Sequence, residues 1–245
     1  MKPFLHLSIR DHDRAVAAEF EAICAFGGLQ PGELVQLRAE QAPLPVIHPD
    51  DYAGIIIGGG QFNTSDEVKT PVQQRVESDL GSIVEDAIAH RVPLLGMCYG
   101  VGVVTQHLGG LVDRTYSERV GAVEVTLTDA AATDRVFRRL PARFHAFTGH
   151  KEACTVMPEG AVLLATGSAC PVQAYKVGAA VYVTQFHPEL DLPRLIERMR
   201  IYAHAGYFHP DELDDLIEEA RRSGVDATAS RILGHFIAEF RGRGD

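Results

Sequence analysis

The segment that most constrains the fold is a short apolar run that ends at a cysteine between glycines. Residues 92–97 read Val-Pro-Leu-Leu-Gly-Met, then come Cys98, Tyr99 and Gly100, and a second apolar stretch spans residues 101–108. A short, continuously apolar run is typical of a strand buried on both faces of a parallel sheet. A similar run, residues 52–57, ends in three glycines. The chain is therefore expected to pass twice from a buried strand into a tight turn.

Around these two runs, strand and helix patterns alternate. The expected strands span residues 4–9, 34–37, 52–57 and 92–97, and the expected helices span residues 15–21, 71–89 and 101–108. This order predicts an α/β fold, an open and mostly parallel sheet with helices on both faces. Alternating polar and apolar residues at 120–128 indicate a small antiparallel portion, which short strands at 161–165, 173–176 and 179–184 continue. Helical patterns then occupy residues 192–206, 210–223 and 228–241.

The composition excludes several classes of protein. The 245 residues are 46% hydrophobic and carry a formal charge of −10, which suits a packed chain and argues against a nucleic-acid partner. No segment approaches the roughly 18 apolar residues that would span a bilayer. Charged residues appear too early, at Lys2 and Arg10, for a signal peptide. We therefore expect a cytoplasmic protein without a membrane partner.

In that compartment the four cysteines are expected to be reduced. None belongs to a C-x-x-C pair, so no metal site is predicted. Cys98 differs from Cys24, Cys154 and Cys170 because it lies where a strand becomes a helix. A nucleophile on such a turn is pushed out of the sheet, and the amides of the following helix favour its thiolate. The competing interpretation is a buried structural cysteine.

Two further motifs favour catalysis. His187-Pro188-Glu189 follows the last expected strand and supplies a base together with a carboxylate that can orient it. Gly58, Gly59 and Gly60 allow close backbone approach and a second N–H for an oxyanion. All three motifs follow strands, and open α/β sheets form their sites at the carboxyl ends of strands.

With these motifs the sequence resembles the class I, or triad, glutamine amidotransferases. The elbow at residues 96–100, the Gln-Phe-His-Pro-Glu segment at 185–189 and the glycine loop occur in that family's order, and the resemblance covers roughly residues 35–190. It is greatest to stand-alone proteins related to the amidotransferase domain of GMP synthase. The resemblance implies a flavodoxin-like three-layer fold and no cofactor. It also implies that Cys98 attacks glutamine, His187 transfers protons and Glu189 orients His187. The oxyanion hole would comprise Tyr99 with Gly59 or Gly60.

The sequence also departs from the family. Many members carry glutamine at the position of Gly102, so altered glutamine recognition is expected. His150 is either part of the site wall or part of a surface turn. The resemblance implies the following substrate-binding candidates: Gly58, Gly102, Tyr116, Ser117 and His150.

The expected domain organisation is an amidotransferase-like domain at residues 1–200 and a helical extension at 201–245 packed on it. No synthetase domain follows, so the ammonia acceptor, such as a synthetase, would be a separate partner. The final helices would dock that partner, pair with a second copy as a homodimer, or cover the sheet edge, and we favour the last.

Three functions remain open. The leading one is glutamine hydrolysis that delivers ammonia to an acceptor. The second is hydrolysis of γ-glutamyl peptides by the same Cys-His pair, which a wider pocket without the usual glutamine would suit. The third is a catalytically quiet binding or regulatory module, against which the presence of Cys98, His187 and Glu189 counts.

Overall fold

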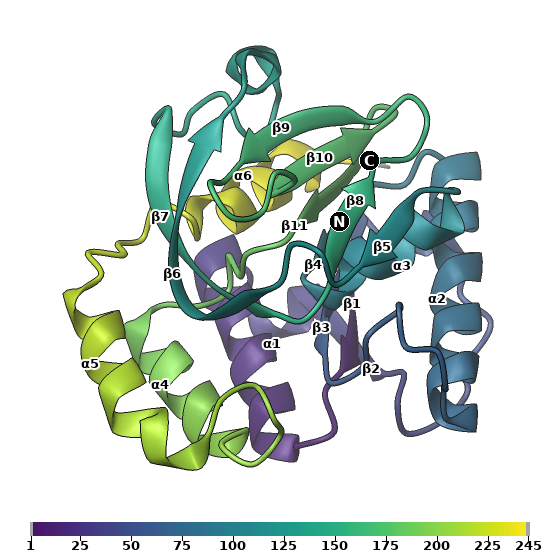
Figure 1. The fold of residues 1–245 in the computed structure, drawn as a ribbon. Helices are drawn as coiled ribbons and strands as arrows, with labels where there is room; N and C mark the ends of the chain where they lie inside the picture. The colour runs from purple at the N-terminus through teal and green to yellow at the C-terminus, as the bar shows by residue number, and fades with distance from the viewer. Residues whose placement is uncertain (1, 244–245) are drawn as a thin grey trace.

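Five short parallel strands form one half of a nine-stranded sheet in the computed structural model, which describes residues 2–243 (Figure 1). In sheet order they are β2 (Leu34–Arg38), β1 (Phe4–Ile9), β3 (Gly54–Gly60), β4 (Leu94–Met97) and β11 (Val181–Thr184). Every residue of β1, β4 and β11 is buried. This burial explains why β4 reads as a continuous apolar run, whereas β1 also buries the polar His6 and Ser8.

The other half of the sheet is antiparallel. It continues from β11 through β10 (Ala174–Val177), β9 (Val162–Thr166), β6 (Glu118–Leu127) and β7 (Arg143–His150). The strand β11 joins the halves, because it pairs parallel with β4 and antiparallel with β10. A separate two-stranded antiparallel sheet pairs β5 (Leu111–Asp113) with β8 (Ala153–Val156). The sequence patterns did not indicate β5, β7 or β8, which are short or mix polar with apolar residues.

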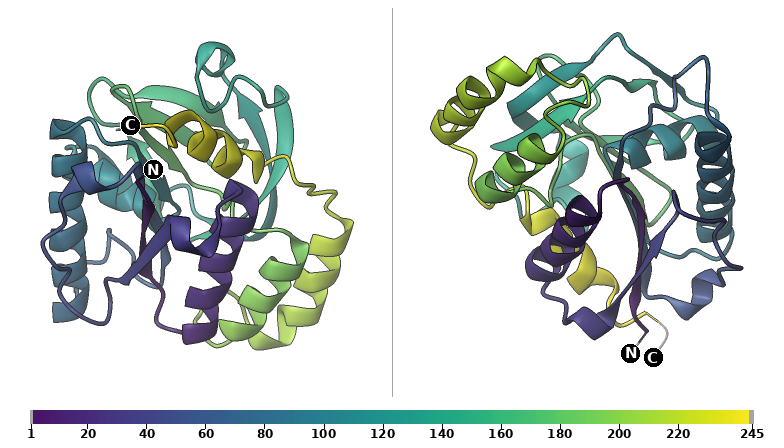
Figure 2. Two further views of the ribbon diagram at one scale, coloured as in Figure 1. Left: turned by 180° about the vertical axis from the view of Figure 1, so that it is seen from behind. Right: turned by 90° about the horizontal axis from the view of Figure 1, so that it is seen from below.

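Helices cover both faces of the sheet, giving three layers (Figure 2). On one face, α2 (Pro71–Ala89) and α3 (Tyr99–His107) pack on Ile55 and Ile57 of β3. On the other, α1 (Asp13–Gly27) and α6 (Arg231–Phe240) pack on Ile56, whose side chain points the opposite way along the strand. The predicted class, a mostly parallel α/β sheet between helices with an antiparallel portion and a helical C-terminal part, is confirmed.

The C-terminal part separates into two groups of helices. The helices α4 (Leu192–Ile201) and α5 (Leu213–Arg222) share an apolar cluster with Phe147 of β7, whereas α6 lies against α1. The expected helix at residues 192–206 ends early at Ile201, and irregular turns lead from there to α5. Short 3-10 helices complete the chain at Pro31–Glu33, Pro49–Asp51, Asp129–Thr133 and Pro210–Glu212.

None of the helices between residues 2 and 243 has the length and apolar character that a membrane crossing requires.

Candidate active site

Cys98 sits on a strained turn between β4 and α3. Its φ of 51° and ψ of −96° lie outside the regions that non-glycine residues favour. The flanking glycines allow close packing: a Cβ on Gly96 would clash with the carbonyl oxygen of Gly100 at 2.9 Å, and one on Gly100 would lie a tight 3.2 Å from that of Ile57. Cys98 is partly exposed, whereas Cys24, Cys154 and Cys170 are buried. The local sequence therefore presents one thiol at the carboxyl end of the sheet.

His187 and Glu189 follow β11 at the same edge. The backbone N–H of His187 donates to the carbonyl of Phe147, and its ring Nδ1 lies 2.7 Å from Oε1 of Glu189. Both side chains are buried, and His187 lines one cavity together with Cys98. Burial acts to lower the pKa of His187, but the Glu189 carboxylate and the Cys98 thiol outweigh it and raise that pKa to about 9. The Glu189 carboxylate thus favours the protonated form of the imidazole.

The three glycines at the end of β3 occupy different positions. A Cβ on Gly59 would lie 3.2 Å from Cε1 of His187, so the backbone runs directly beside the imidazole. Gly60 lines the cavity that contains Cys98. Gly58 faces Glu19 instead, since a Cβ there would lie 2.5 Å from that carboxylate. The backbone of Gly59 and Gly60 is thus near the reacting groups, while Gly58 lies behind them.

Glu152 and Thr64 fill the space beside Gly102. The backbone and hydroxyl of Thr64 donate to Oε1 of Glu152 at 2.7 and 3.0 Å, and the backbone of Ser65 donates to Oε2 at 2.7 Å. A Cβ on Gly102 would lie 2.5 Å from Oγ1 of Thr64. A longer side chain at this position is therefore excluded by the present arrangement. Glu152 was not among the predicted site residues, and no local pattern indicates this contact.

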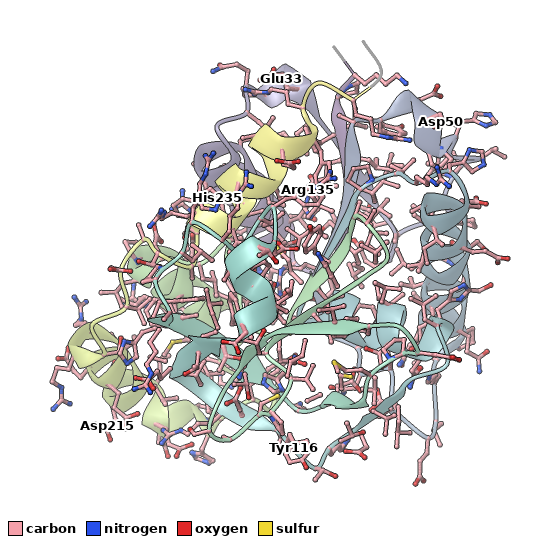
Figure 3. The ribbon with its side chains drawn as sticks, turned by 90° about the horizontal axis from the view of Figure 1, so that it is seen from above. Glu33, Asp50, Tyr116, Arg135, Asp215 and His235 are labelled. Carbon is pink, nitrogen blue, oxygen red and sulfur yellow. The ribbon has the colours of Figure 1, made fainter. Side chains whose placement is uncertain are left out.

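His150 is buried, which rules out the surface-turn alternative. It ends β7, with Nδ1 2.8 Å from the carbonyl oxygen of Glu152 and Nε2 2.9 Å from Oε2 of Glu118. Tyr116 and Ser117 precede β6; Ser117 is exposed, and Figure 3 shows Tyr116 near the edge of the molecule. Neither of these two lines the cavities described here.

Within residues 2–243, one group of three or more side chains of the kinds that bind metals has its ligand atoms within 4.8 Å of one another. Its members are Glu118, His150 and Cys170. The direct contact between His150 and Glu118 already pairs the atoms that a metal would use. Burial raises the pKa of Cys170 to about 12, which keeps its thiol protonated. Hydrogen bonding explains this cluster without an ion.

Two cavities meet at Cys98. The larger, which opens to solvent, lies between the sheet edge, α4 and the turns after α4. It is lined by Arg10, Gly60, Gln61, Cys98, Val120, Thr148, Gly149, His187, Leu190, Leu195, Arg198, Met199, Tyr202, Tyr207 and Phe208. The smaller lies on the Glu152 side and is lined by Asn63, Cys98, Tyr99, Gly149, His150, Lys151, Glu152, Gln185 and Tyr207. His187 lines only the larger of the two.

Several of these residues were not anticipated. Arg10 directly follows β1, so the rule that sites form at the carboxyl ends of parallel strands would have found it. Arg198 and Tyr207 come from the C-terminal part of the chain, where charged and aromatic residues of a helical pattern gave no signal.

The relatives of this chain include GMP synthases and their subunits. A glutamine-hydrolyzing GMP synthase subunit from Thermococcus kodakarensis is 32% identical over 149 residues, which is 60% of this chain and 72% of the relative. The corresponding GMP synthase subunit from Methanothermobacter thermautotrophicus is 32% identical over 65% of this chain and 76% of its own length. The glutamine-hydrolyzing GMP synthase of Streptomyces coelicolor is 28% identical over 72% of this chain, but the match covers only 33% of that longer protein.

Solved structures agree on the fold. A glutamine amidotransferase from Methylobacillus flagellatus superposes with a TM-score of 0.72 at 21% identity, over 98% of this chain and 94% of the other. A glutamine amidotransferase from Thermotoga maritima gives a TM-score of 0.73 at 20% identity, over 98% of both chains. The family model for glutamine amidotransferase class-I matches residues 32–196. Because this match covers more than half of the sequence, the chain belongs to the class I glutamine amidotransferase family.

Proposed function

We propose that this protein hydrolyses the side-chain amide of glutamine to glutamate and ammonia. The observation that carries the proposal is the meeting of the strained Cys98 turn with the His187–Glu189 pair in one cavity. A thiolate beside a charged imidazole, oriented in turn by a carboxylate, is the arrangement that acyl transfer through a thiol requires.

In the proposed reaction the Cys98 thiolate attacks the amide carbon, and the carbonyl oxygen becomes an oxyanion. The N–H groups of Tyr99 and of Gly59 or Gly60 are the proposed donors to that oxyanion. His187 gives its proton to the leaving nitrogen as the C–N bond breaks, which releases ammonia and leaves a γ-glutamyl thioester. His187 then takes a proton from water, whose oxygen attacks the thioester, and glutamate leaves as Cys98 is restored.

We further propose that the ammonia is used by an acceptor site on a separate chain, such as a synthetase. The support is that two of the relatives are named as subunits of a glutamine-hydrolyzing GMP synthase. A cytoplasmic setting is part of the proposal, because a free thiol nucleophile needs a reducing compartment.

The test is ammonia release from glutamine by the purified protein and by two cysteine variants. Cys98→Ala removes the nucleophile, so we expect the rate to fall at least about 10⁴-fold. Cys24→Ala is the matched control, because Cys24 is a buried thiol in α1 away from the cavity, and it should keep wild-type activity. Ammonia release that survives Cys98→Ala would refute the mechanism. If the wild type neither hydrolyses an amide nor reacts with a glutamine-like chloroketone, the protein is instead a binding or regulatory module without catalytic activity.

A second candidate, hydrolysis of γ-glutamyl peptides, is favoured by the larger cavity. The leaving nitrogen must lie on the side of His187, and apolar side chains such as Val120, Leu190, Met199 and Phe208 line the cavity there. Ammonia needs no such space, whereas an apolar amine would fill it. Comparing kcat/KM for glutamine and γ-glutamyl anilide separates the two functions. We expect glutamine to be preferred at least about tenfold, and the reverse preference would select the second candidate.

A further inference from the structure

Glu189 is one of four buried charges that alternate in sign around a ring behind His187; the others are Arg198, Glu19 and Arg10. Nη1 of Arg198 lies 2.7 Å from Oε1 of Glu189, and Nε of Arg10 lies 2.9 Å from Oε1 of Glu19. Two longer contacts of 3.9 Å close the ring, from Arg198 to Glu19 and from Arg10 to Glu189. Each carboxylate therefore faces both guanidinium groups.

The ring is almost completely shielded from water. The side chains of Glu19 and Glu189 are 0% exposed, that of Arg10 is 6% exposed and that of Arg198 is 13% exposed. Buried charges are costly unless they are paired, and here two positive and two negative charges cancel. Burial raises the pKa of Glu19, but Arg10, His6 and Arg198 outweigh it and hold that pKa below its usual range. Glu19 is thus ionised.

The protein makes room for Glu19. Glu19 occupies the buried face of α1, where an apolar residue is the usual choice, and His6 of β1 lies 3.2 Å from its second oxygen. Gly58 lies directly against this carboxylate, and any side chain at position 58 would clash with it. Glu19, Arg10 and Arg198 all lie outside residues 32–196, the range that the family model matches. Three of the four ring members are therefore supplied by the parts of the chain that flank the matched range, and Glu189 lies within it.

We propose that Glu19, Arg10 and Arg198 are positioning residues that set the electrostatic balance at His187 and Cys98. This inference rests on the proposed function for its catalytic meaning. Glu19 contacts neither His187 nor Cys98, but it neutralises the two arginines that converge on Glu189. Without it, an excess positive charge remains buried behind the imidazole. Without Arg198, an excess negative charge remains there.

The two changes therefore act in opposite directions on protonation at the site. Excess positive charge favours the thiolate and disfavours the imidazolium, so pH profiles move to lower pH; excess negative charge moves them to higher pH. Around His187 lie the Cys98 thiol, the Glu189 carboxylate and the Arg198 guanidinium, whose Nη1 is 3.3 Å from Nδ1 of the imidazole. Tyr202 and Tyr207 line the same cavity. Glu19→Gln alters none of these groups, whereas Arg198→Gln also removes the direct contact with His187.

The test is the rate of Cys98 alkylation by iodoacetamide as a function of pH, followed by mass spectrometry of the Cys98 peptide. We expect Glu19→Gln to move the profile to lower pH and Arg198→Gln to move it to higher pH, each by about half a pH unit or more. Arg198→Lys retains the charge and should return the profile towards that of the wild type. Shifts in the same direction, or no shift in either variant, would overturn the proposal. A merely structural role does not predict that the two variants shift the pH profile in opposite directions.

Glu197→Gln is the matched control. Glu197 neighbours Arg198 in α4 and pairs with Arg14 of α1 at 2.6 Å on the surface, so this variant weakens the same helix contact without touching the ring. Its profile should equal that of the wild type. If Glu19→Gln does not fold, Arg198→Gln and its rescue by lysine decide the question alone. Alkylation does not require glutamine, so a wild type that is alkylated but releases no ammonia refutes the proposed function and leaves this inference to be judged by the shifts.

Discussion

At the scale of single residues, the backbone at Cys98 is the clearest mark of function. In the part of the chain that the structure describes, the non-glycine residues with positive φ are Arg91 and Cys98. Such conformations cost on the order of 1–3 kcal/mol and persist where the surrounding structure enforces them. At Cys98 the strain aims the sulfur into the cavity that His187 also lines. The strain is thus consistent with the role that we propose for Cys98.

Gly102 gives a prediction about stability at the same scale. A Cβ there would lie 2.5 Å from Oγ1 of Thr64 and 2.9 Å from Oε1 of Glu152. We expect Gly102→Ala to destabilise the protein by about 1–3 kcal/mol through overpacking, measured by urea unfolding. Gly32→Ala is the control, since nothing lies within 4 Å of a Cβ there and the effect should be small. Equal urea midpoints for Gly102→Ala and the wild type would contradict this prediction and show that Thr64 and Glu152 can move aside at little cost.

At the scale of elements, α6 is the part of the C-terminal extension that reaches the main core. Its Phe236 is 0% exposed and its ring lies 6.3 Å from that of Phe4 in β1 and 6.2 Å from that of Tyr182 in β11. The same apolar cluster contains Ile56 of β3. We therefore propose that residues 201–245 fold on residues 1–200 as one cooperative unit.

Phe236→Ala tests that proposal. Removing a buried phenylalanine leaves a cavity, and we expect a loss of about 3–5 kcal/mol in the free energy of unfolding. If α6 belongs to the same unit as the sheet, the urea transitions followed by far-ultraviolet circular dichroism and by tyrosine fluorescence should shift together. Glu239→Ala, a change at a partly exposed ion pair with Arg135, should leave both transitions unchanged. Separate transitions in Phe236→Ala would show that the extension unfolds independently.

At the scale of the whole molecule, segments from near both ends of the sequence meet beside the site that the middle of the chain forms. The helices α1 and α4 lie side by side in both views of Figure 2, and they carry Glu19 and Arg198 to the same edge of the sheet where β4 and β11 end. The parallel pairing of β11 with β4, in which Thr184 lies opposite Met97, places His187 next to the turn that carries Cys98.

The sequence by itself determined the order of the parallel strands with the helices between them, and the turn at Cys98. Buried parallel strands are encoded as short apolar runs, and a sharp turn between a strand and a helix needs glycine at fixed offsets, so both are visible in windows of fewer than about ten residues. The same holds for His187 and Glu189, which are only two positions apart and meet at 2.7 Å.

Only the tertiary structure decided what surrounds those residues. Three features depend on contacts between segments far apart in the sequence. They are the position of Glu152 beside Gly102, the burial of His150 and the charge ring that joins Glu189 to Glu19, Arg10 and Arg198. Glu19 and Arg198 look like ordinary charged helix residues until α1 and α4 pack against the sheet. A charge is stable in that position only when its partners arrive from other elements, and no local pattern records which partners those will be.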